Sequence, residues 1–208
     1  MDWPIFEGLP PADVDAVLQA ARRRTFDRGE VVFHRDDPGD SLHLVVKGRF
    51  AVRVMTPLGD VATLGIRVPG QSFGEMALVD PEAHRSATVQ ALEAGETRAL
   101  AYSQLAHLRP AVDRMLVALL AEELRRHNEL LLDAFYVPAE RRVLRRLLEH
   151  GSPVVLTQEE LAQLAGTSRA TVNRVLRDEE KRGAVRLERG RVTILDADAL
   201  RRRARTAA

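Results

Sequence analysis

The chain has 208 residues, of which 45% are apolar and 29% are charged, and it contains no cysteine. This length and composition predict a globular protein of one or two domains, and the lack of cysteine excludes disulfides, iron–sulfur clusters and thiol redox chemistry. No run of about 18 apolar residues occurs, so no transmembrane helix is expected. Residues 1–4 lack the charged and apolar blocks of a signal peptide, so a cytoplasmic protein without membrane contact is the default expectation.

The formal net charge of +1 conceals an uneven distribution along the chain. Residues 139–208 hold 16 Lys+Arg against 10 Asp+Glu, a balance of +6, whereas residues 1–138 hold 15 against 20, a balance of −5. Such asymmetry predicts that the C-terminal part meets a polyanion, such as a nucleic acid, and that the N-terminal part does not.

The N-terminal part predicts one short helix followed by strands. The helix is expected to start at Pro11, because apolar residues follow it at helical spacing: Val14, Val17, Leu18 and Ala21. Residues 25–105 hold short apolar or alternating runs, among them 31–33, 42–46, 50–54 and 62–66, with glycine between them about every ten residues. Short strands at that pitch predict an antiparallel β-sandwich or roll.

The segment 74–89 carries the most informative chemistry of this part. A Gly74-Glu75 step precedes an Arg85-Ser86 step by eleven residues. Arg85 can supply a cation and Ser86 a hydroxyl to one phosphate, and a turn at Gly74 can supply backbone N–H groups. Glu75 repels a phosphate, so it suits a ligand that also donates a hydroxyl, such as a ribose 2′-OH. The pattern therefore predicts a nucleotide site, and the alternative is a surface turn with an unrelated Arg-Ser pair.

Residues 111–136 predict a long helix that is apolar on more than one face, through Val112, Leu116, Leu119, Leu120, Leu124, Leu130, Leu131 and Phe135. One stripe can cover the β-roll. The other needs a partner, and a second copy of the same helix, giving a homodimer, is the simplest one. The alternative is a fully buried core helix.

Pro138 breaks the long helix, which places a hinge near residues 137–138. A further helix is expected over 139–150, with Val143, Leu144, Leu147 and Leu148 apolar and 151–153 ending it.

The sequence then predicts a helix-turn-helix. Residues 157–160 form a capping box that opens a helix over 161–165, residues 166–168 form a tight turn, and Ser168 caps a second helix from Arg169 to about Lys181. Residues 186–195, interrupted at 189–190, predict a two-stranded wing. On the second helix the inward positions are Val172, Val175 and Leu176, and the opposite face holds Arg169, Ala170, Asn173, Arg174 and Arg177.

Such a face suits the major groove of DNA, because arginine pairs with guanine edges and asparagine with adenine edges. The hydroxyls of Thr157, Ser168 and Thr171 are placed where they could bond phosphates. The alternative is an ordinary solvated helix face, which the turn, the caps and the wing disfavour.

Together these motifs resemble the CRP/FNR family of bacterial transcription regulators over roughly residues 5–200. The resemblance implies an α+β chain with three parts: a cyclic-nucleotide-binding antiparallel β-roll (1–110), a dimerisation helix and hinge (111–137), and a winged helix-turn-helix DNA-binding domain (138–208). It implies cyclic AMP as effector, an inverted-repeat operator in double-stranded DNA, and RNA polymerase as a partner. Gly74, Glu75, Arg85 and Ser86 are similar to the family's ribose and phosphate positions, and Met76 and Ala77, which follow directly, join the expected ligand site.

Two positions depart from the cyclic-AMP receptors that the chain resembles. The Thr-Ser pair that contacts adenine on their long helix is replaced here by His127-Asn128, and both residues can still hydrogen-bond a purine edge. A glutamate that accepts from cytosine is replaced by Ala170, so one base preference is expected to weaken. By the same resemblance, Arg169 and Arg174 match base-reading arginines.

Three other functions compete with this interpretation. Within the family, the pocket could be vestigial and the regulator independent of ligand. A regulatory subunit that binds a cyclic nucleotide and acts on a protein partner is a second alternative, which the winged helix-turn-helix disfavours. An enzyme is the third, but no His-x-His metal set, nucleophile triad or Walker loop occurs, so no catalytic residue, metal or haem ligand is expected.

Overall fold

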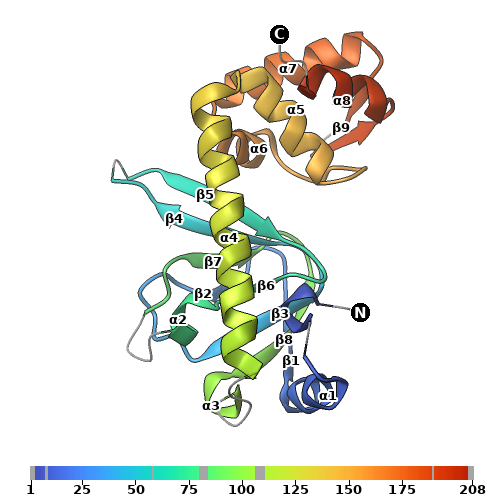
Figure 1. The fold of residues 1–208 in the computed structure, drawn as a ribbon. Helices are drawn as coiled ribbons and strands as arrows, with labels where there is room; N and C mark the ends of the chain where they lie inside the picture. The colour runs from blue at the N-terminus through green and yellow to red at the C-terminus, as the bar shows by residue number, and fades with distance from the viewer. Residues whose placement is uncertain are drawn as a thin grey trace. The chain divides into compact units, whose positions relative to one another are not determined.

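The computed structural model describes residues 3–7, 9–57, 59–79, 84–105, 111–188 and 190–205. The chain separates into two compact units, Met1–Leu124 and Arg125–Ala208 (Figure 1). The middle of the predicted nucleotide segment, residues 80–83, and one residue of the predicted wing turn, Arg189, lie outside the described residues.

Within its described residues, the first unit is built on two four-stranded antiparallel sheets (Figure 1). Their orders are β1-β8-β3-β6 and β2-β7-β4-β5. The strands are β1 Arg22–Phe26, β2 Val31–Phe33, β3 Ser41–Lys47, β4 Phe50–Met55, β5 Val61–Arg67, β6 Ser72–Phe73, β7 Thr88–Ala91 and β8 Gly95–Ala101. The short helices of this unit are η1 Pro4–Phe6, α1 Pro11–Ala20, α2 Met76–Val79 and α3 Tyr102–Leu105.

Apolar residues that alternate along the strands fill the space between the two sheets. Phe26, Val45 and Phe73 of one sheet pack with Phe50 and Val89 of the other. The outer face of the first sheet is also apolar, so it needs a cover as well. Helices supply that cover, in a second core that contains Leu42, Leu44, Leu100, Phe6, Val17 and Leu105.

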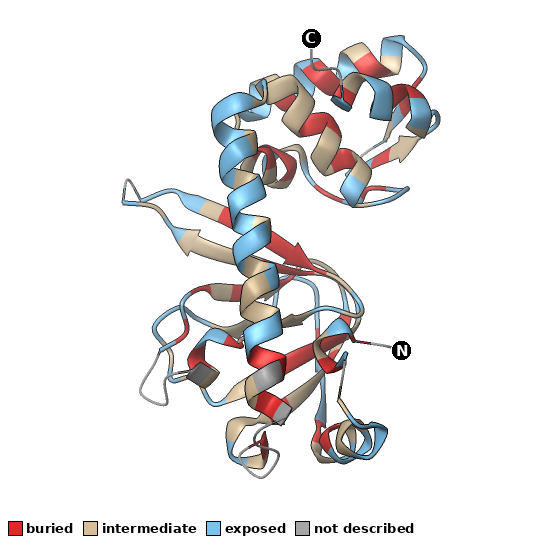
Figure 2. Cartoon of the chain, in the orientation of Figure 1, coloured by how far each residue is buried: buried red, intermediate tan, exposed pale blue. Residues whose placement is uncertain are grey.

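The long helix α4 spans Ala111–Tyr136, the bounds that the sequence predicts. Its first turns belong to the second core, where Val112, Met115 and Leu116 are buried. Its later apolar side chains are exposed (Figure 2): Leu124 to 63%, Leu131 to 54% and Phe135 to 76%. The helix therefore covers the sheet at its N-terminal end and leaves an apolar stripe uncovered further along.

The second unit contains the predicted winged helix-turn-helix. Its elements are α5 Ala139–Glu149, α6 Gln158–Ala165, α7 Arg169–Lys181, β9 Val185–Glu188, β10 Arg191–Ile194 and α8 Ala197–Arg205. The capping box at Thr157 is present, and Gly166 ends α6 with a φ of 58°, in the left-handed region that glycine adopts without strain. Ser168 caps α7, and Val172, Val175 and Leu176 are buried as predicted.

One arginine fixes the end of α4 against the helix-turn-helix. Arg142 of α5 donates from Nε to the Ala165 carbonyl oxygen (2.8 Å) and from a terminal nitrogen to that of Gly166 (2.8 Å), so it satisfies orphan carbonyls at the end of α6. Its other terminal nitrogen donates to the carbonyl oxygen of Val137 (2.8 Å), just after α4. The turn that precedes α7 is thereby tied to the hinge.

The predicted fold class, antiparallel roll, long helix and winged helix-turn-helix, is confirmed. The bounds of some helices and strands differ from the predicted ones. The first strand begins at Arg22 rather than in the region that starts at residue 25, helix α5 ends at Glu149, and α6 begins at Gln158 rather than residue 161. The sequence interpretation did not include α8, whose buried residues Ala199, Leu200 and Ala204 pack it into the second unit.

A buried histidine makes the stability of the first unit depend on pH. The ring of His43 stacks on Phe73 with centroids 5.0 Å apart, and its Nδ1 lies 3.1 Å from Thr97 Oγ1. Burial, with a smaller contribution from the Arg85 cation, lowers the pKa of His43 to about 3. Because an exposed histidine in the unfolded chain titrates near about 6.5, the unfolded state binds more protons than the folded state below that pH.

We therefore expect the free energy of unfolding to fall as pH drops from about 6.5 towards 3, with a His43 contribution of at most about 1.4 kcal/mol per pH unit. In the variant His43→Gln this contribution to the slope should disappear, although overall stability drops. Urea unfolding at a series of pH values measures it. His34→Gln, at an exposed histidine, is the control, and equal slopes in the two variants would contradict the assignment.

Candidate ligand pocket and nucleic-acid interface

A small cavity of about 50 Å³ lies in the first unit where β6 turns into α2. The six ligand-site residues predicted within the segment 74–89 line it: Gly74, Glu75, Met76, Ala77, Arg85 and Ser86. Phe33, Val52, Arg67, Phe73, Ala87 and Val89 complete the described lining. The structure thus brings together residues that the sequence could only relate by spacing, and their assignment to a ligand stays a prediction.

Gly74 allows the backbone to approach Arg85 closely. Its φ is +93°, a conformation that costs other residues strain. A Cβ atom on Gly74 would lie 2.8 Å from a terminal nitrogen of Arg85 and 3.0 Å from the Ser41 carbonyl oxygen. Any side chain at this position would displace the arginine or the strand that holds it.

Arg85 is only 3% exposed and is held by several acceptors from distant parts of the sequence. One terminal nitrogen donates to the carbonyl oxygens of Ser41 (2.8 Å) and Gly74 (3.2 Å) and to the Tyr102 hydroxyl (3.2 Å). The other donates to Asp40 Oδ1 (3.0 Å) and to Ser41 Oγ (3.2 Å). The guanidinium also lies 4.1 Å from the ring centroid of Phe33, and its Nε is buried with no hydrogen-bond partner among the described residues.

The sequence interpretation missed Asp40, Ser41 and Tyr102. The residue types at 37–40, Asp-Pro-Gly-Asp, indicate only a turn, and nothing near Tyr102 relates it to Arg85 along the chain. In the structure the Tyr102 hydroxyl also donates to the Gly74 carbonyl oxygen. Burial raises the pKa of Tyr102 to about 12, so the phenol stays protonated and keeps its donor at neutral pH.

Glu75 is the second unusual group of the cavity. It is 7% exposed, and its Oε2 is buried with no hydrogen-bond partner in the described part of the chain. Burial raises the pKa of Glu75, and the nearby cation of Arg67 partly offsets this. A buried carboxylate oxygen without a donor is costly, so it fits a ligand that brings a hydroxyl.

Arg67 connects the cavity to the long helix. Its side chain donates from Nε to the Ser72 carbonyl oxygen (3.1 Å) and from a terminal nitrogen to Glu123 Oε1 of α4 (2.7 Å). The sequence interpretation missed this residue as well, because the predicted strand run, 62–66, stops before position 67.

The other predicted ligand residues differ in exposure. Ala77 is buried, whereas Met76 is 50% exposed and Ser86 is exposed. His127 and Asn128 are both exposed on the part of α4 that belongs to the second unit. Their predicted contact with a purine base stays a prediction.

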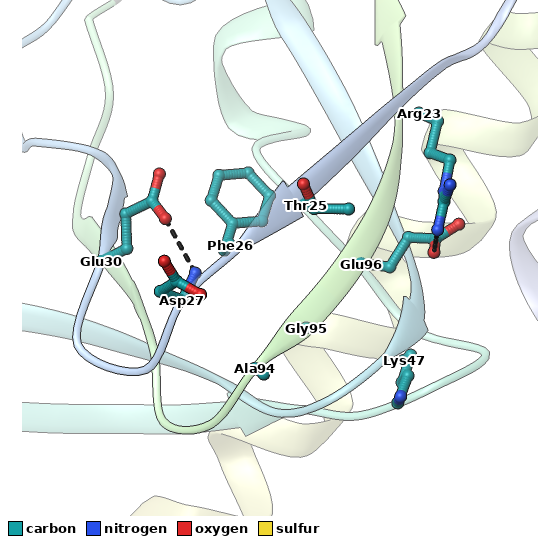
Figure 3. A pocket seen from close by; sticks show the side chains of 9 residues that line it. All are labelled: Arg23, Thr25, Phe26, Asp27, Glu30, Lys47, Ala94, Gly95 and Glu96. Atoms are coloured by element: carbon teal, nitrogen blue, oxygen red, sulfur yellow. Dashed lines mark hydrogen bonds and ion pairs between the residues drawn. The ribbon is translucent and has the colours of Figure 1, made fainter.

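A second hollow in the first unit is larger, about 270 Å³, but its chemistry is less specific (Figure 3). Its charged lining groups are of both signs, and some already pair with each other. Arg23 binds Glu96 at 2.7 Å, and Glu30 accepts from the backbone nitrogen of Asp27 at 2.8 Å. No orphaned buried polar atom is found among its described residues, so we favour the smaller cavity as the ligand site.

In the second unit, α7 exposes the predicted reading face. Arg169, Ala170, Asn173, Arg174 and Arg177 are all exposed. A groove of about 610 Å³ runs between α7 and the wing and is lined in part by Thr157, Arg169, Asn173 and Arg191. A basic helix beside such a groove is the arrangement that a DNA major groove accepts.

Two of the three predicted phosphate-binding hydroxyls, those of Thr157 and Ser168, also act as helix caps. Thr157 Oγ1 accepts from the backbone nitrogen of Glu160 (3.1 Å), and Ser168 Oγ accepts from that of Thr171 (3.2 Å). Ser168 Oγ lies 3.1 Å from Thr171 Oγ1. Thr157 and Ser168 remain exposed, so capping leaves them accessible to a phosphate.

Most of the reading face is engaged by protein partners. Asn173 Nδ2 donates to Gln158 Oε1 (3.1 Å), Arg177 pairs with Glu180 (3.1 Å), and Arg174 pairs with Glu140 Oε1 of α5 (2.6 Å). The side chain of Arg169 makes no hydrogen bond within the described residues.

Two negative findings apply to the described ranges only. No three His, Asp or Glu side chains there gather closely enough to hold a metal ion. No helix there is both long enough and apolar enough to cross a bilayer.

Comparison with known proteins gives matches over both units. Residues 23–109 match the cyclic nucleotide-binding domain, and residues 141–203 match the Crp-like helix-turn-helix domain. The chain is 36% identical to a CRP-like cAMP-activated global transcriptional regulator of Mycobacterium tuberculosis, over 97% of this chain and 96% of that protein.

A second relative is the cyclic AMP receptor protein of Thermus thermophilus, 40% identical over 93% of each chain. Among solved structures, the catabolite activator protein of Thermus thermophilus matches with a TM-score of 0.56 at 37% identity, covering 97% of this chain and 98% of that one.

The geometry around Gly74 gives a test of the cavity. We expect Gly74→Ala to lower the free energy of unfolding by about 1–3 kcal/mol through backbone strain, with a further loss because the new Cβ crowds Arg85. Gly29→Ala is the matched control, since Gly29 has a φ of +85° but no described atom within 4 Å of an added Cβ. Urea unfolding of both variants separates strain from crowding, and equal losses would show that the Arg85 contact does not matter.

Proposed function

The chain belongs to the CRP/FNR family of DNA-binding transcription regulators controlled by a cyclic nucleotide, and we propose that its effector is cyclic AMP. The resemblance inferred from the sequence is thereby confirmed at the level of the family. We further propose that the protein acts as a homodimer on an inverted-repeat operator and contacts RNA polymerase there, in the cytoplasm and without a catalytic step. The segments 1–110, 111–137 and 138–208 are the proposed effector, dimerisation and DNA-binding parts.

The observation that carries the effector proposal is the pairing of two unusual buried groups in one cavity. Arg85 and Ser86 would hold the cyclic phosphate, and the orphaned Glu75 Oε2 would accept a hydrogen bond from the ribose 2′-OH. A phosphate gives Arg85 a charged acceptor and so a stronger hydrogen bond than a carbonyl does. The two named relatives are described as cAMP-activated and as a cyclic AMP receptor, which supports the same ligand.

One observation favours a vestigial pocket instead. The terminal nitrogens of Arg85 already donate to protein acceptors, and the cavity of about 50 Å³ is smaller than a typical ligand pocket of roughly 300 Å³ or more. Cyclic AMP can bind only if the cavity widens and the phosphate replaces some of these acceptors. The affinity of the protein for cyclic AMP therefore distinguishes a functional pocket from a vestigial one.

We expect titration calorimetry to detect cyclic AMP binding to the full-length protein, and Arg85→Ala to weaken it. Truncating one member of a buried charge pair costs roughly 2–5 kcal/mol, or about 30-fold to several-thousand-fold in affinity. Arg49→Ala is the control, because Arg49 is also largely buried and paired, with Glu93 at 2.9 Å, and it lies outside the described cavity lining. Wild-type affinity weaker than about millimolar would favour the vestigial pocket.

The dimer proposal rests on the uncovered stripe of α4. Leu124, Leu131 and Phe135 are each more than half exposed, and a helix with a second apolar face is stabilised when another helix covers it. We expect the double variant Leu120→Glu/Leu124→Glu to be monomeric by light scattering and to lose DNA affinity. Leu195→Glu, at an apolar residue 51% exposed in the second unit, should remain dimeric. A monomeric wild type would contradict the proposal.

The DNA proposal predicts the symmetry of the preferred site. A two-fold dimer presents α7 to successive major grooves, so half-site centres should lie about one helical turn, or 10–11 base pairs, apart. Selection from a random DNA library measures this spacing.

The substitutions Arg169→Ala and Arg174→Ala should each cost about 1–3 kcal/mol of binding free energy on the selected site. The base pair that faces Ala170 should tolerate substitution, or be read through a thymine methyl. Arg201→Ala, on α8, is the control; asymmetric selected sites would refute the dimeric mode of binding.

A further inference from the structure

An acidic residue of α5 lies directly against one arginine of the reading face. Glu140, in the first turn of α5, accepts a hydrogen bond from a terminal nitrogen of Arg174 at 2.6 Å, although 34 residues separate them in sequence. The side chain of Arg174 has no other hydrogen-bond partner among the described residues. Both side chains are about half exposed, 58% for Arg174 and 46% for Glu140, so the pair is open to an approaching ligand.

Stability alone does not explain this pair. An exposed ion pair contributes little to folding because water and salt screen it. The hydrogen bond from Arg174, together with a bond from the backbone of the helix terminus, holds the pKa of Glu140 below its usual range. The carboxylate is therefore charged at neutral pH, and it sits beside a side chain that meets DNA, where a negative charge repels phosphates.

A charged acid next to a base-reading arginine has a different effect on specific and on non-specific DNA. Non-specific binding is driven by cations that neutralise phosphates and release counterions, and the Arg174–Glu140 pair carries no net charge to contribute. A guanidinium has five N–H donors, and Glu140 takes one of them. Enough donors remain for the O6 and N7 acceptors of a guanine, while the carboxylate restrains the plane of the guanidinium.

We propose that Glu140 positions Arg174 and thereby determines the specificity of DNA binding. When paired with Glu140, Arg174 can still bind a guanine edge but contributes little to the binding of phosphates alone. The inference rests on the proposed DNA-binding role of α7 and deepens it. Arg169 provides the internal contrast, because its side chain has no hydrogen-bond partner in the described chain and its charge serves specific and non-specific binding alike. The two arginines of one helix thus have different tasks.

The test compares Glu140→Gln with wild type in the full-length dimer, in the presence of cyclic AMP. Glutamine keeps the size and an acceptor for Arg174 but removes the charge. Fluorescence anisotropy measures affinity for the selected operator and for a scrambled duplex of equal length over a range of salt concentrations. We expect tighter binding to the scrambled duplex, a salt dependence steeper by about 0.9 per protomer, and a specificity ratio reduced on the order of tenfold.

The matched control is Glu149→Gln. Glu149 lies on the same helix and also pairs with an arginine, Arg146 at 2.6 Å, but that arginine is not on α7. The substitution Glu149→Gln removes one negative charge from the same unit as Glu140→Gln does, so any general effect of net charge appears in both variants. Circular dichroism and thermal unfolding check that both variants fold like wild type.

Three outcomes are decisive. If Glu140→Gln and Glu149→Gln have equal salt slopes and equal specificity ratios, the inference is wrong. If the effect of Glu140→Gln on the ratio persists in an Arg174→Ala background, Glu140 does not act through Arg174, and the inference is again wrong. If wild-type protein prefers no selected duplex over scrambled DNA, the proposed DNA-binding function itself fails, which is a distinguishable result.

Discussion

The burial of the Arg85 guanidinium is the constraint on which the effector unit depends. A buried cation is tolerated only when acceptors surround it, and here those acceptors come from three separate elements. Asp40 and Ser41 lie at the start of β3, Gly74 lies in the turn after β6, and Tyr102 begins α3. One side chain therefore fixes the relative positions of a strand, the nucleotide segment and a helix. Gly74 is needed because a Cβ at that position would occupy the space of the guanidinium.

We propose that the same contacts make the pocket responsive to a ligand. Asp40 is 85% exposed and holds Arg85 from the solvent side, so it is the acceptor that an anion can most readily replace. Glu75, in contrast, lacks a partner, because its buried Oε2 has no hydrogen-bond donor in the described chain. A ligand that offers a phosphate to Arg85 and a hydroxyl to Glu75 satisfies both groups at once. Arg67, which lines the same cavity, is bonded to Glu123 in the middle of α4.

The sequence predicted the features that depend on interactions between residues close together in the chain. The capping box at Thr157, the glycine turn at Gly166 and the period of α4 depend on near neighbours in the chain, and those helices were found at or close to the predicted bounds. Groups joined across the fold were missed. Tyr102 and Asp40 reach Arg85 only after β3 and β8 pair, and α8 is held in part through the buried Glu179, which binds Arg203 from 24 residues away. Periodicity contains no information about such contacts.

The ligand pocket and the reading helix share one electrostatic design. In each, an arginine that could bind an anion is paired with a carboxylate of the protein: Arg85 with Asp40 and Arg174 with Glu140. A bare arginine attracts any phosphate, whereas a paired arginine binds only a partner that offers more than charge. In the proposed function, Arg85 gains this from the ligand hydroxyl that satisfies Glu75, and Arg174 gains it from the paired acceptors of a guanine edge. On this proposal, selectivity at both sites follows from exchanging one acceptor for another, rather than from attraction alone.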